Sequence, residues 1–274
     1  MIRLAVRVKR AQAEVVLAEL LELAPSGLEE RDLGDVIEYA VYGAPGELPI
    51  LADVRAAAGG ALIEIATQEL PDDWPERWKA FHVPIDIGTA QRRLRVRAPW
   101  HEPTAEGSDI VIDPGQAFGT GGHPTTRLCL ELLIERSGAP GAVVDLGCGS
   151  GVLAIAAARL GFAPVLGLDH DPLAVAATID NAAVNGVVVD ARRHDLRHDG
   201  PAPSAPTMLA NLLRPLLLTV AEAGFDGPPP QALVVGGLLV DECDEVAAAF
   251  ARRGLREQER RTKGEWAALA LGAG

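Results

Sequence analysis

The 274-residue sequence is poor in cysteine and in basic side chains. Its three cysteines, Cys129, Cys148 and Cys243, lie far apart and lack metal-ligand spacing. We therefore expect neither a disulfide framework nor a metal site, and a reducing compartment is favoured. Lysine and arginine number 25 against 38 acidic residues, which gives a formal net charge of −13. A chain with this negative charge is poorly suited to direct nucleic-acid recognition and better suited to binding a basic protein.

The sequence also lacks a long hydrophobic run. Near the C-terminus, the longest apolar stretch is residues 232–240, which is too short to cross a bilayer. Residues 1–16 alternate charged and apolar side chains, without the apolar core of a signal peptide. We therefore expect a cytoplasmic protein with no membrane partner.

Residues 1–70 predict a small α+β domain. Strands are expected at 2–8 and 61–67, helices at 11–23 and 48–58, and a hairpin of residues 28–33 and 36–41 about Gly34-Asp35. The order β-α-β-β-α-β is that of a ferredoxin-like domain. These residues contain no histidine, no cysteine and no cluster of polar side chains. Recognition of a substrate and simple packing are both compatible with such a domain.

Residues 71–109 predict a connector followed by an extended segment. Aromatic and basic side chains are concentrated there: Trp74, Trp78, Phe81, Arg92, Arg93, Arg95 and Arg97. A nucleic-acid site would combine these residue types. The alternation around Leu94 and Val96 has a simpler explanation, a strand with one solvated basic face, and we favour it.

Residues 110–274 predict a doubly wound, Rossmann-like α/β domain. Strands are expected at 143–146, 165–169, 187–193, 207–212, 232–236, 255–261 and 266–271. Helices are expected at 127–136, 151–160, 172–185, 216–223 and 240–252, the third capped by Asp171 with Pro172 at its first position. In such a mainly parallel sheet, ligands bind at the carboxyl ends of the strands.

A glycine-rich turn follows the first of these strands. Residues 145–151 read D-L-G-C-G-S-G. Gly147 and Gly149 allow a tight turn and close approach to a ligand, and the following helix N-terminus favours an anionic group. The spacing G-x-G-x-G differs from the dinucleotide pattern G-x-G-x-x-G. With Asp145 placed to bind an ammonium group, directly or through water, the turn fits a methionine moiety better.

Polar residues at the ends of the later strands predict a nucleoside ligand and an amine acceptor. Asp169 ends the second strand, where an acid can bind both ribose hydroxyls. Asp195 follows the third strand and is equally compatible with an adenine contact and with a solvated loop. Asn211 ends the fourth strand, and it and the carbonyls after it would orient an amine. The Asn-Pro-Pro-aromatic tetrapeptide of base-amine methyltransferases is absent.

Residues 113–126 predict a ligand-covering loop, because many glycines lie there beside phenylalanine, histidine and two threonines. Thr125 or Thr126 is expected to cap the helix at 127–136. His123 can be interpreted as a general base, but a lone loop histidine more often orders its own turn, and we favour that role.

Taken together, these motifs resemble the bacterial methyltransferases of ribosomal protein L11, the large-subunit stalk-base protein. The resemblance runs from about residue 70 to the end and includes 113–126, 145–151, 210–212, the Asp73-Trp74 and Trp78-Lys79 pairs, and Pro99-Trp100. It implies S-adenosyl-L-methionine as cofactor, a small domain that captures the ribosomal protein, and methylation of lysine ε-amines and an N-terminal α-amine.

The site residues that we expect combine the turn analysis with this resemblance. Asn211 is the expected catalytic residue. The expected cofactor-binding residues are Phe118, Gly119, Thr120, Thr126, Asp145, Gly147, Gly149, Asp169 and Asn211. An amine held on the methyl axis needs mainly positioning, so we expect no indispensable general base.

Two departures from the family leave alternatives open. Gly122 stands where the family usually has threonine, and Arg214 stands beside the acceptor channel, where it would repel a protonated lysine. The alternatives are a methyltransferase of a small molecule or of another protein, a non-catalytic cofactor-binding module on the ribosome, and an NAD-dependent oxidoreductase, which the glycine spacing disfavours.

Overall fold

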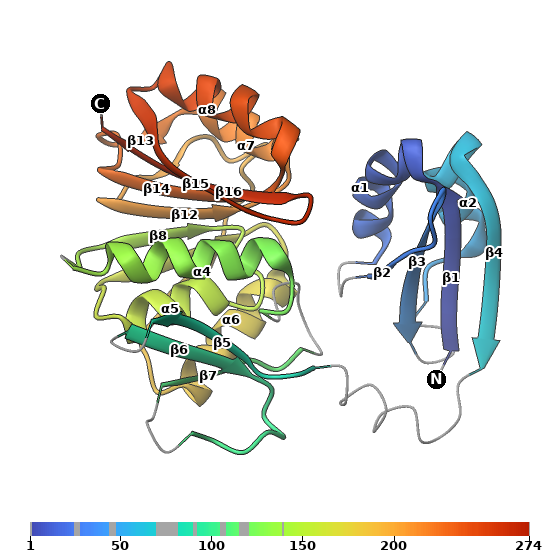
Figure 1. Ribbon diagram of the computed structural model, residues 1–274, viewed down its shortest axis with the longest axis horizontal. Helices are drawn as coiled ribbons and strands as arrows, with labels where there is room; N and C mark the ends of the chain where they lie inside the picture. Colours follow the sequence, from blue (N-terminus) through green and yellow to red (C-terminus); the bar gives the residue numbers. More distant parts are fainter. Residues whose placement is uncertain are drawn as a thin grey trace. The chain divides into compact units, whose positions relative to one another are not determined.

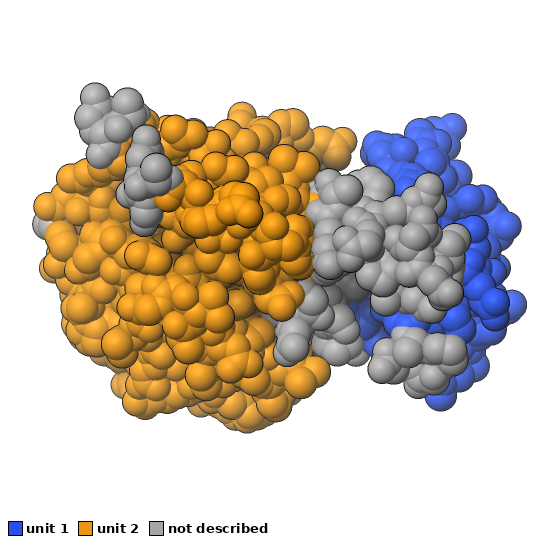
Figure 2. All heavy atoms as spheres, turned by 90° about the horizontal axis from the view of Figure 1, so that it is seen from below, with its two compact units in different colours: residues 1–81 blue, residues 82–274 orange. Residues whose placement is uncertain are grey.

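The computed structural model describes residues 2–24, 28–43, 48–69, 82–89, 92–104, 108–114, 121–138 and 140–273. The chain divides into two units, residues 1–81 and 82–274 (Figure 2). The sequence assigns residues 71–109 to a connector and extended segment, whereas the structure groups residues 82–109 with the second unit. The reason is that the strands formed there pack on helices of that unit.

The first unit has the predicted β-α-β-β-α-β order (Figure 1). Its elements are β1 (Ile2–Lys9), α1 (Ala13–Leu23), β2 (Glu29–Asp32), β3 (Val36–Gly43), α2 (Leu51–Ala58) and β4 (Leu62–Glu69), with short 3₁₀ turns at Arg10–Gln12 and Gly59–Ala61. The antiparallel sheet has the order β2-β3-β1-β4. This order confirms the ferredoxin-like prediction.

One face of this sheet packs on the helices and the other carries a polar network. Leu4, Val6 and Val8 of β1 are buried in the same core as Val16 and Leu20 of α1. Because side chains alternate along a strand, the intervening residues of β1 point to the opposite face.

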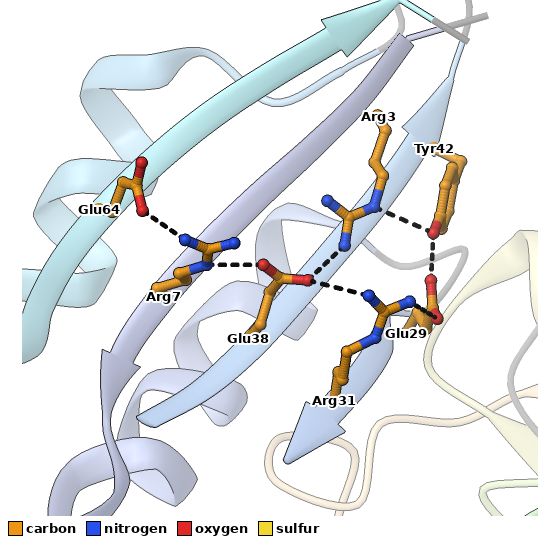
Figure 3. Close-up of polar contacts among 7 residues, drawn as sticks. All are labelled: Arg3, Arg7, Glu29, Arg31, Glu38, Tyr42 and Glu64. Atoms are coloured by element: carbon orange, nitrogen blue, oxygen red, sulfur yellow. Dashed lines mark hydrogen bonds and ion pairs between the residues drawn. The ribbon is translucent and has the colours of Figure 1, made fainter. Parts of the chain in front are cut away.

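On that opposite face, Glu38 of β3 is only 2% exposed and pairs with both Arg3 and Arg7 of β1 (Figure 3). Arg31 of β2 lies 4.0 Å from Glu38, and Arg7 also reaches Glu64 of β4. Side chains of all four strands therefore meet in one network.

The second unit is built on a seven-stranded sheet of order β10-β9-β8-β12-β14-β16-β15. Its strands are β8 (Val143–Leu146), β9 (Val165–Asp169), β10 (Asp190–Arg193), β12 (Thr207–Asn211), β14 (Ala232–Leu239), β15 (Leu255–Lys263) and β16 (Trp266–Ala273). The first five are parallel and β16 is antiparallel to both of its neighbours. The predicted doubly wound, mainly parallel sheet is confirmed.

Helices cover both faces of this sheet. One core unites α4 (Pro124–Arg136) and α5 (Val152–Arg159) with sheet residues, and α6 (Pro172–Val184) contributes to it. A second core unites α7 (Arg214–Ala223) and α8 (Cys243–Ala251) with the opposite face. A 3₁₀ turn (Val240–Glu242) precedes α8, and β11 (Ala202–Pro203) pairs with β13 (Phe225–Asp226).

Three further strands pack at α4 and α5: β5 (Ile85–Thr89), β6 (Arg92–Arg97) and β7 (Asp109–Val111). Leu94 and Val96 of β6 are buried, which confirms the strand interpretation of this segment. Its basic side chains are partly matched by acids, since Arg93 pairs with Asp86 and Arg97 with Asp109. Within the described ranges, the helices are all too short or too polar to cross a membrane.

Candidate functional site

Three polar residues predicted from the sequence come together at the carboxyl edge of the large sheet. β8 lies between β9 and β12. Asp145 is on β8, Asp169 ends β9 and Asn211 ends β12. In a parallel sheet these strand ends meet at one edge, which is where such folds bind ligands.

The glycine-rich turn forms the floor of this edge. Gly147, Gly149 and Gly151 have φ values of +68°, +54° and +82°, in the left-handed region that favours glycine. The Gly147 and Cys148 amides donate to the carbonyl of Leu168, at 2.8 and 3.0 Å. A Cβ on Gly147 would clash with the Leu212 side chain. The turn is therefore tight, and Leu212 packs so closely against Gly147 that a residue with a Cβ does not fit there.

Asp145 is a buried carboxyl group with one oxygen available. It is 1% exposed, and its Oδ2 accepts the Ala154 amide at 3.1 Å. Its Oδ1 is buried without a hydrogen-bond partner among the residues that the structure describes. Burial, and to a lesser degree the nearby Asp169 carboxylate, raises the pKa of Asp145 to about 8. A cationic ligand group at Oδ1 would favour the ionised form.

Asp169 is held in place by backbone amides. Its Oδ2 accepts the Gly149 amide at 2.9 Å and its Oδ1 accepts the Asp171 amide at 3.1 Å. The hydrogen bond from Gly149 thus fixes the position of the Asp169 carboxylate relative to the glycine turn. Oδ2 keeps a further lone pair for a hydroxyl donor, whereas Oδ1 also lies 3.3 Å from Nδ1 of His170.

Asp195 is engaged in its own turn instead. Its Oδ1 accepts the Arg197 amide at 2.9 Å, and its Oδ2 lies 2.9 Å from Nδ1 of His198. Of the two interpretations of Asp195, these contacts support the acidic residue of a solvated loop.

Asn211 offers the second buried oxygen without a partner. Its Nδ2 donates to Oγ1 of Thr126 at 3.1 Å, which fixes the orientation of the amide. Its Oδ1 is buried and has no hydrogen-bond partner within the described ranges. An acceptor oxygen of this kind suits a ligand N–H group.

The start of α4 differs from the prediction. The cap is His123, whose Nδ1 accepts the Thr125 amide at 3.4 Å, and not a threonine. Pro124 at the first helical position starts the helix three residues earlier than expected, so Thr125 and Thr126 lie inside its first turn and are buried.

His123 orders the start of α4 and packs on the last strand of the sheet. Its ring meets Trp266 edge to face, with centroids 4.6 Å apart. Burial lowers the pKa of His123 and favours its neutral form. These contacts agree with the turn-ordering role that the sequence favours.

A glycine pair beside Asn211 was not predicted from the sequence. Gly236 and Gly237 form a bulge in β14, where the pairing with β16 shifts register. A Cβ on Gly236 would lie 3.0 Å from Oδ1 of Asn211, and one on Gly237 would clash with the Leu212 backbone. The signal was present in the sequence, since paired glycines inside a strand indicate a bulge or a close approach.

Arg214 does not present the unbalanced charge expected from the sequence. Its Nε lies 3.0 Å from Glu242 and its Nη1 lies 2.8 Å from Glu245. Two carboxylates therefore offset the guanidinium, and the expected repulsion of a lysine loses its basis. Their contribution could not be anticipated, because they come from a distant segment at the start of α8.

The expected contacts Phe118, Gly119 and Thr120 lie outside the described residues. The described part of the site still defines a chemistry. It combines a buried carboxylate oxygen, a glycine cradle, an amide-anchored Asp169 and a buried amide oxygen. These groups fit an amino-acid ammonium, two ribose hydroxyls and an amine, which are the groups that S-adenosyl-L-methionine and an amine acceptor would bring together.

Comparisons with known proteins agree with this chemistry. The family model of the ribosomal protein L11 methyltransferase (PrmA) matches residues 50–273. A ribosomal protein L11 methyltransferase of Geobacter sulfurreducens is 39% identical over 259 residues, which are 89% of this chain and 83% of the relative. One from Heliobacterium modesticaldum is 40% identical over 203 residues, or 72% of this chain, and the match spans only 63% of that relative.

A solved structure shows the same likeness. The crystal structure of a ribosomal protein L11 methylase from Lactobacillus delbrueckii subsp. bulgaricus has a TM-score of 0.59 to this chain and 28% sequence identity. The superposition covers 69% of this chain and 98% of that one.

Proposed function

The chain belongs to the ribosomal protein L11 methyltransferase family, and we propose on this premise that it methylates amines of ribosomal protein L11 with S-adenosyl-L-methionine. The acceptors are lysine ε-amines, the N-terminal α-amine, or both. The observation that carries the proposal is that two buried oxygens at this edge of the sheet, Oδ1 of Asp145 and Oδ1 of Asn211, have no hydrogen-bond partner among the described residues and lie on the neighbouring strands β8 and β12.

The cofactor would be held by the glycine turn and the two aspartates. Asp145 would bind the ammonium group, the turn at Gly147 and Gly149 would approach the methionine moiety, and Asp169 would bind the ribose hydroxyls. When bound, the cofactor supplies a methyl group on a positively charged sulfur. Thr126 would lie beside it through its hydrogen bond to Asn211.

The acceptor amine would be positioned by Asn211. Its Oδ1 accepts an amine N–H and so directs the nitrogen lone pair, while Thr126 prevents the amide from turning. The amine must be neutral, and a buried position lowers the pKa of a lysine. No base is needed at the moment of transfer in this arrangement, so His123 serves the start of α4 rather than proton transfer.

The partner we propose is the ribosomal protein itself, at the base of the large-subunit stalk, modified in the cytoplasm. The net charge of −13 favours a basic protein partner. The first unit has no catalytic constellation in its sequence, and we assign it to substrate recognition. The neutralised Arg214 removes the main argument for a different acceptor.

Mass spectrometry of purified L11 after incubation with the protein and S-adenosyl-L-methionine tests the proposal. We expect added methyl groups on lysine or on the N-terminus, and none with Asn211→Ala. Cofactor binding, measured separately by calorimetry, should be weaker in that variant but still measurable, because Asp145, Asp169 and the glycine turn are retained. An unmodified L11 in the presence of a protein that binds cofactor would refute the substrate assignment; absence of cofactor binding would refute the whole proposal.

A further inference from the structure

Helix α6 and the residue that caps its C-terminus bury three polar side chains, which face the glycine turn and β7. Thr178, Asn181 and Asn185 are 0%, 6% and 4% exposed. Their spacing of three and four residues places them on one face of the helix. Buried polar groups are almost always hydrogen-bonded, so their partners show what this face holds.

Two of these side chains hold the carbonyls of the turn. Nδ2 of Asn181 donates to the Ser150 carbonyl at 2.9 Å, and Oγ1 of Thr178 donates to the Gly149 carbonyl at 3.0 Å. On its other side, Oδ1 of Asn181 accepts the Asp113 amide at 3.2 Å. Asn181 therefore bridges the glycine turn and the segment that follows β7.

Holding these carbonyls determines the orientation of the turn. Glycine has the greatest backbone freedom of any residue, and the turn contains three glycines with positive φ. Because the peptide unit is planar, a carbonyl fixed against α6 fixes the whole unit. The two peptide units held in this way, Gly149–Ser150 and Ser150–Gly151, directly follow the Gly149 amide that donates to Oδ2 of Asp169 at 2.9 Å.

Asn185 provides an internal comparison one turn further along α6. It accepts the Val111 amide at 2.8 Å and donates to the Val111 carbonyl at 2.7 Å. It also donates to the backbone carbonyl of Asn181 at 2.7 Å. Its burial and chemistry match those of Asn181, but its recorded hydrogen bonds go to β7 and to its own helix and not to the glycine turn.

We propose that Asn181 is a positioning residue of the cofactor site, which acts through the Ser150 carbonyl to keep the glycine turn and Asp169 in their binding geometry. This rests on the proposed function, because it takes the turn to be the cofactor cradle. Asn181 does not itself need to touch the ligand. Asn185 holds β7 and is not part of this device.

The test compares Asn181→Leu in α6 with Asn185→Leu at the C-cap of the same helix, two changes of the same size. Calorimetry with S-adenosylhomocysteine gives the Kd, and amide hydrogen exchange of residues 147–151 in the unliganded protein reports the turn. For Asn181→Leu we expect about tenfold weaker binding and faster exchange in the turn. For Asn185→Leu we expect a comparable loss of thermal stability but an unchanged Kd.

Thr178→Val serves if Asn181→Leu does not fold, because it removes a carbonyl donor with little change of shape, and it too should weaken binding. Equal Kd values for the Asn181 variant and the wild type, or equal weakening in both asparagine variants, would overturn the inference. Failure of the wild type to bind S-adenosylhomocysteine would instead count against the proposed function, so the two failures are distinguishable.

Discussion

Asp145, which we propose binds the cofactor, shows how such a residue can cost stability before its ligand arrives. Its carboxyl group is buried, and one oxygen has no partner within the described ranges. Burial raises its pKa from 3.8 to about 8, so the unliganded protein keeps a proton that the unfolded chain loses. Between these two pH values the folded state binds more protons, and stability falls as the pH rises.

Asp145→Asn should remove this pH dependence. We expect the unliganded variant to be more stable than the wild type at pH 8 by about 2 kcal/mol, and the difference to shrink toward pH 4. The same change should strongly weaken cofactor binding, because the negative charge that would pair with the ammonium group is lost. Urea unfolding between pH 5 and pH 8 and calorimetry measure the two effects.

The exposed Asp180→Asn on α6 is the control and should follow the wild-type curve in both measurements. A wild-type protein whose stability does not fall across this pH range, relative to Asp145→Asn, would contradict the argument. So would tight cofactor binding by Asp145→Asn.

For single residues, the sequence predicts the position of side chains at the ends of buried strands. It does not predict the contacts of a side chain whose partners are distant in the sequence. Asp169 and Asn211 were placed correctly at the carboxyl edge of the sheet. Each is the last residue of a parallel strand, and the carboxyl ends of such strands lie at the same edge. The charge of Arg214 was judged without its two partners, because Glu242 and Glu245 come from the 3₁₀ turn before α8 and from α8 itself. Side-chain pairing across such a distance leaves no periodic signal.

The four-stranded sheet of the first unit shows what a charge network does for an element. Burial alone would raise the pKa of Glu38, but hydrogen bonds from Arg7 and Arg3 outweigh it and hold the pKa below its ordinary value. The network connects all four strands on the face opposite the helices (Figure 3). The pH dependence of stability that Glu38 contributes is therefore opposite to that of Asp145. A carboxylate whose pKa is lowered on folding stabilises the folded state at neutral pH, and this stabilisation is lost as the pH falls through the lowered pKa.

Glu38→Gln should therefore destabilise the first unit at pH 7, by about 3 kcal/mol, because a half-buried Arg3 loses its carboxylate partner. Hydrogen exchange of β1 and β3 measures the effect in this unit alone. The difference from the wild type should diminish in acid. Glu64→Gln, at the exposed end of the same network, should cost less than about 1 kcal/mol; equal losses in the two variants would argue against a special role for the buried carboxylate.

Element boundaries were predicted less well than element types. β14 continues beyond residue 236 because the bulge at Gly236 and Gly237 carries the chain on to Leu239, whereas the sequence pattern stops at the glycines. β10 begins only at Asp190, and the preceding Val188 is exposed rather than paired. In both cases the strand boundary is determined by pairing with a neighbouring strand. The hydrophobic pattern of a single strand carries no information about that pairing.

On the scale of the whole molecule, the two units have separate cores. The core of the first unit contains residues from β1, α1, β3 and α2, and the two cores of the second unit contain only residues beyond 82. Each unit therefore has its own hydrophobic stabilisation. Every residue that we assign to the cofactor and acceptor lies in the second unit.

This separation predicts the result of shortening the chain to residues 82–274. We expect the shortened protein to fold and to bind S-adenosylhomocysteine about as tightly as the full chain, because the cradle, Asp145 and Asp169 are all retained. Methylation of L11 should fall at least about a hundredfold in kcat/KM, since binding energy from parts of the substrate remote from the reacting amine is lost. Calorimetry and a methyl-transfer assay separate the two readouts. Unchanged methylation of L11 would show that the first unit does not recognise the substrate, whereas loss of cofactor binding would show that the second unit depends on the first for its folded state.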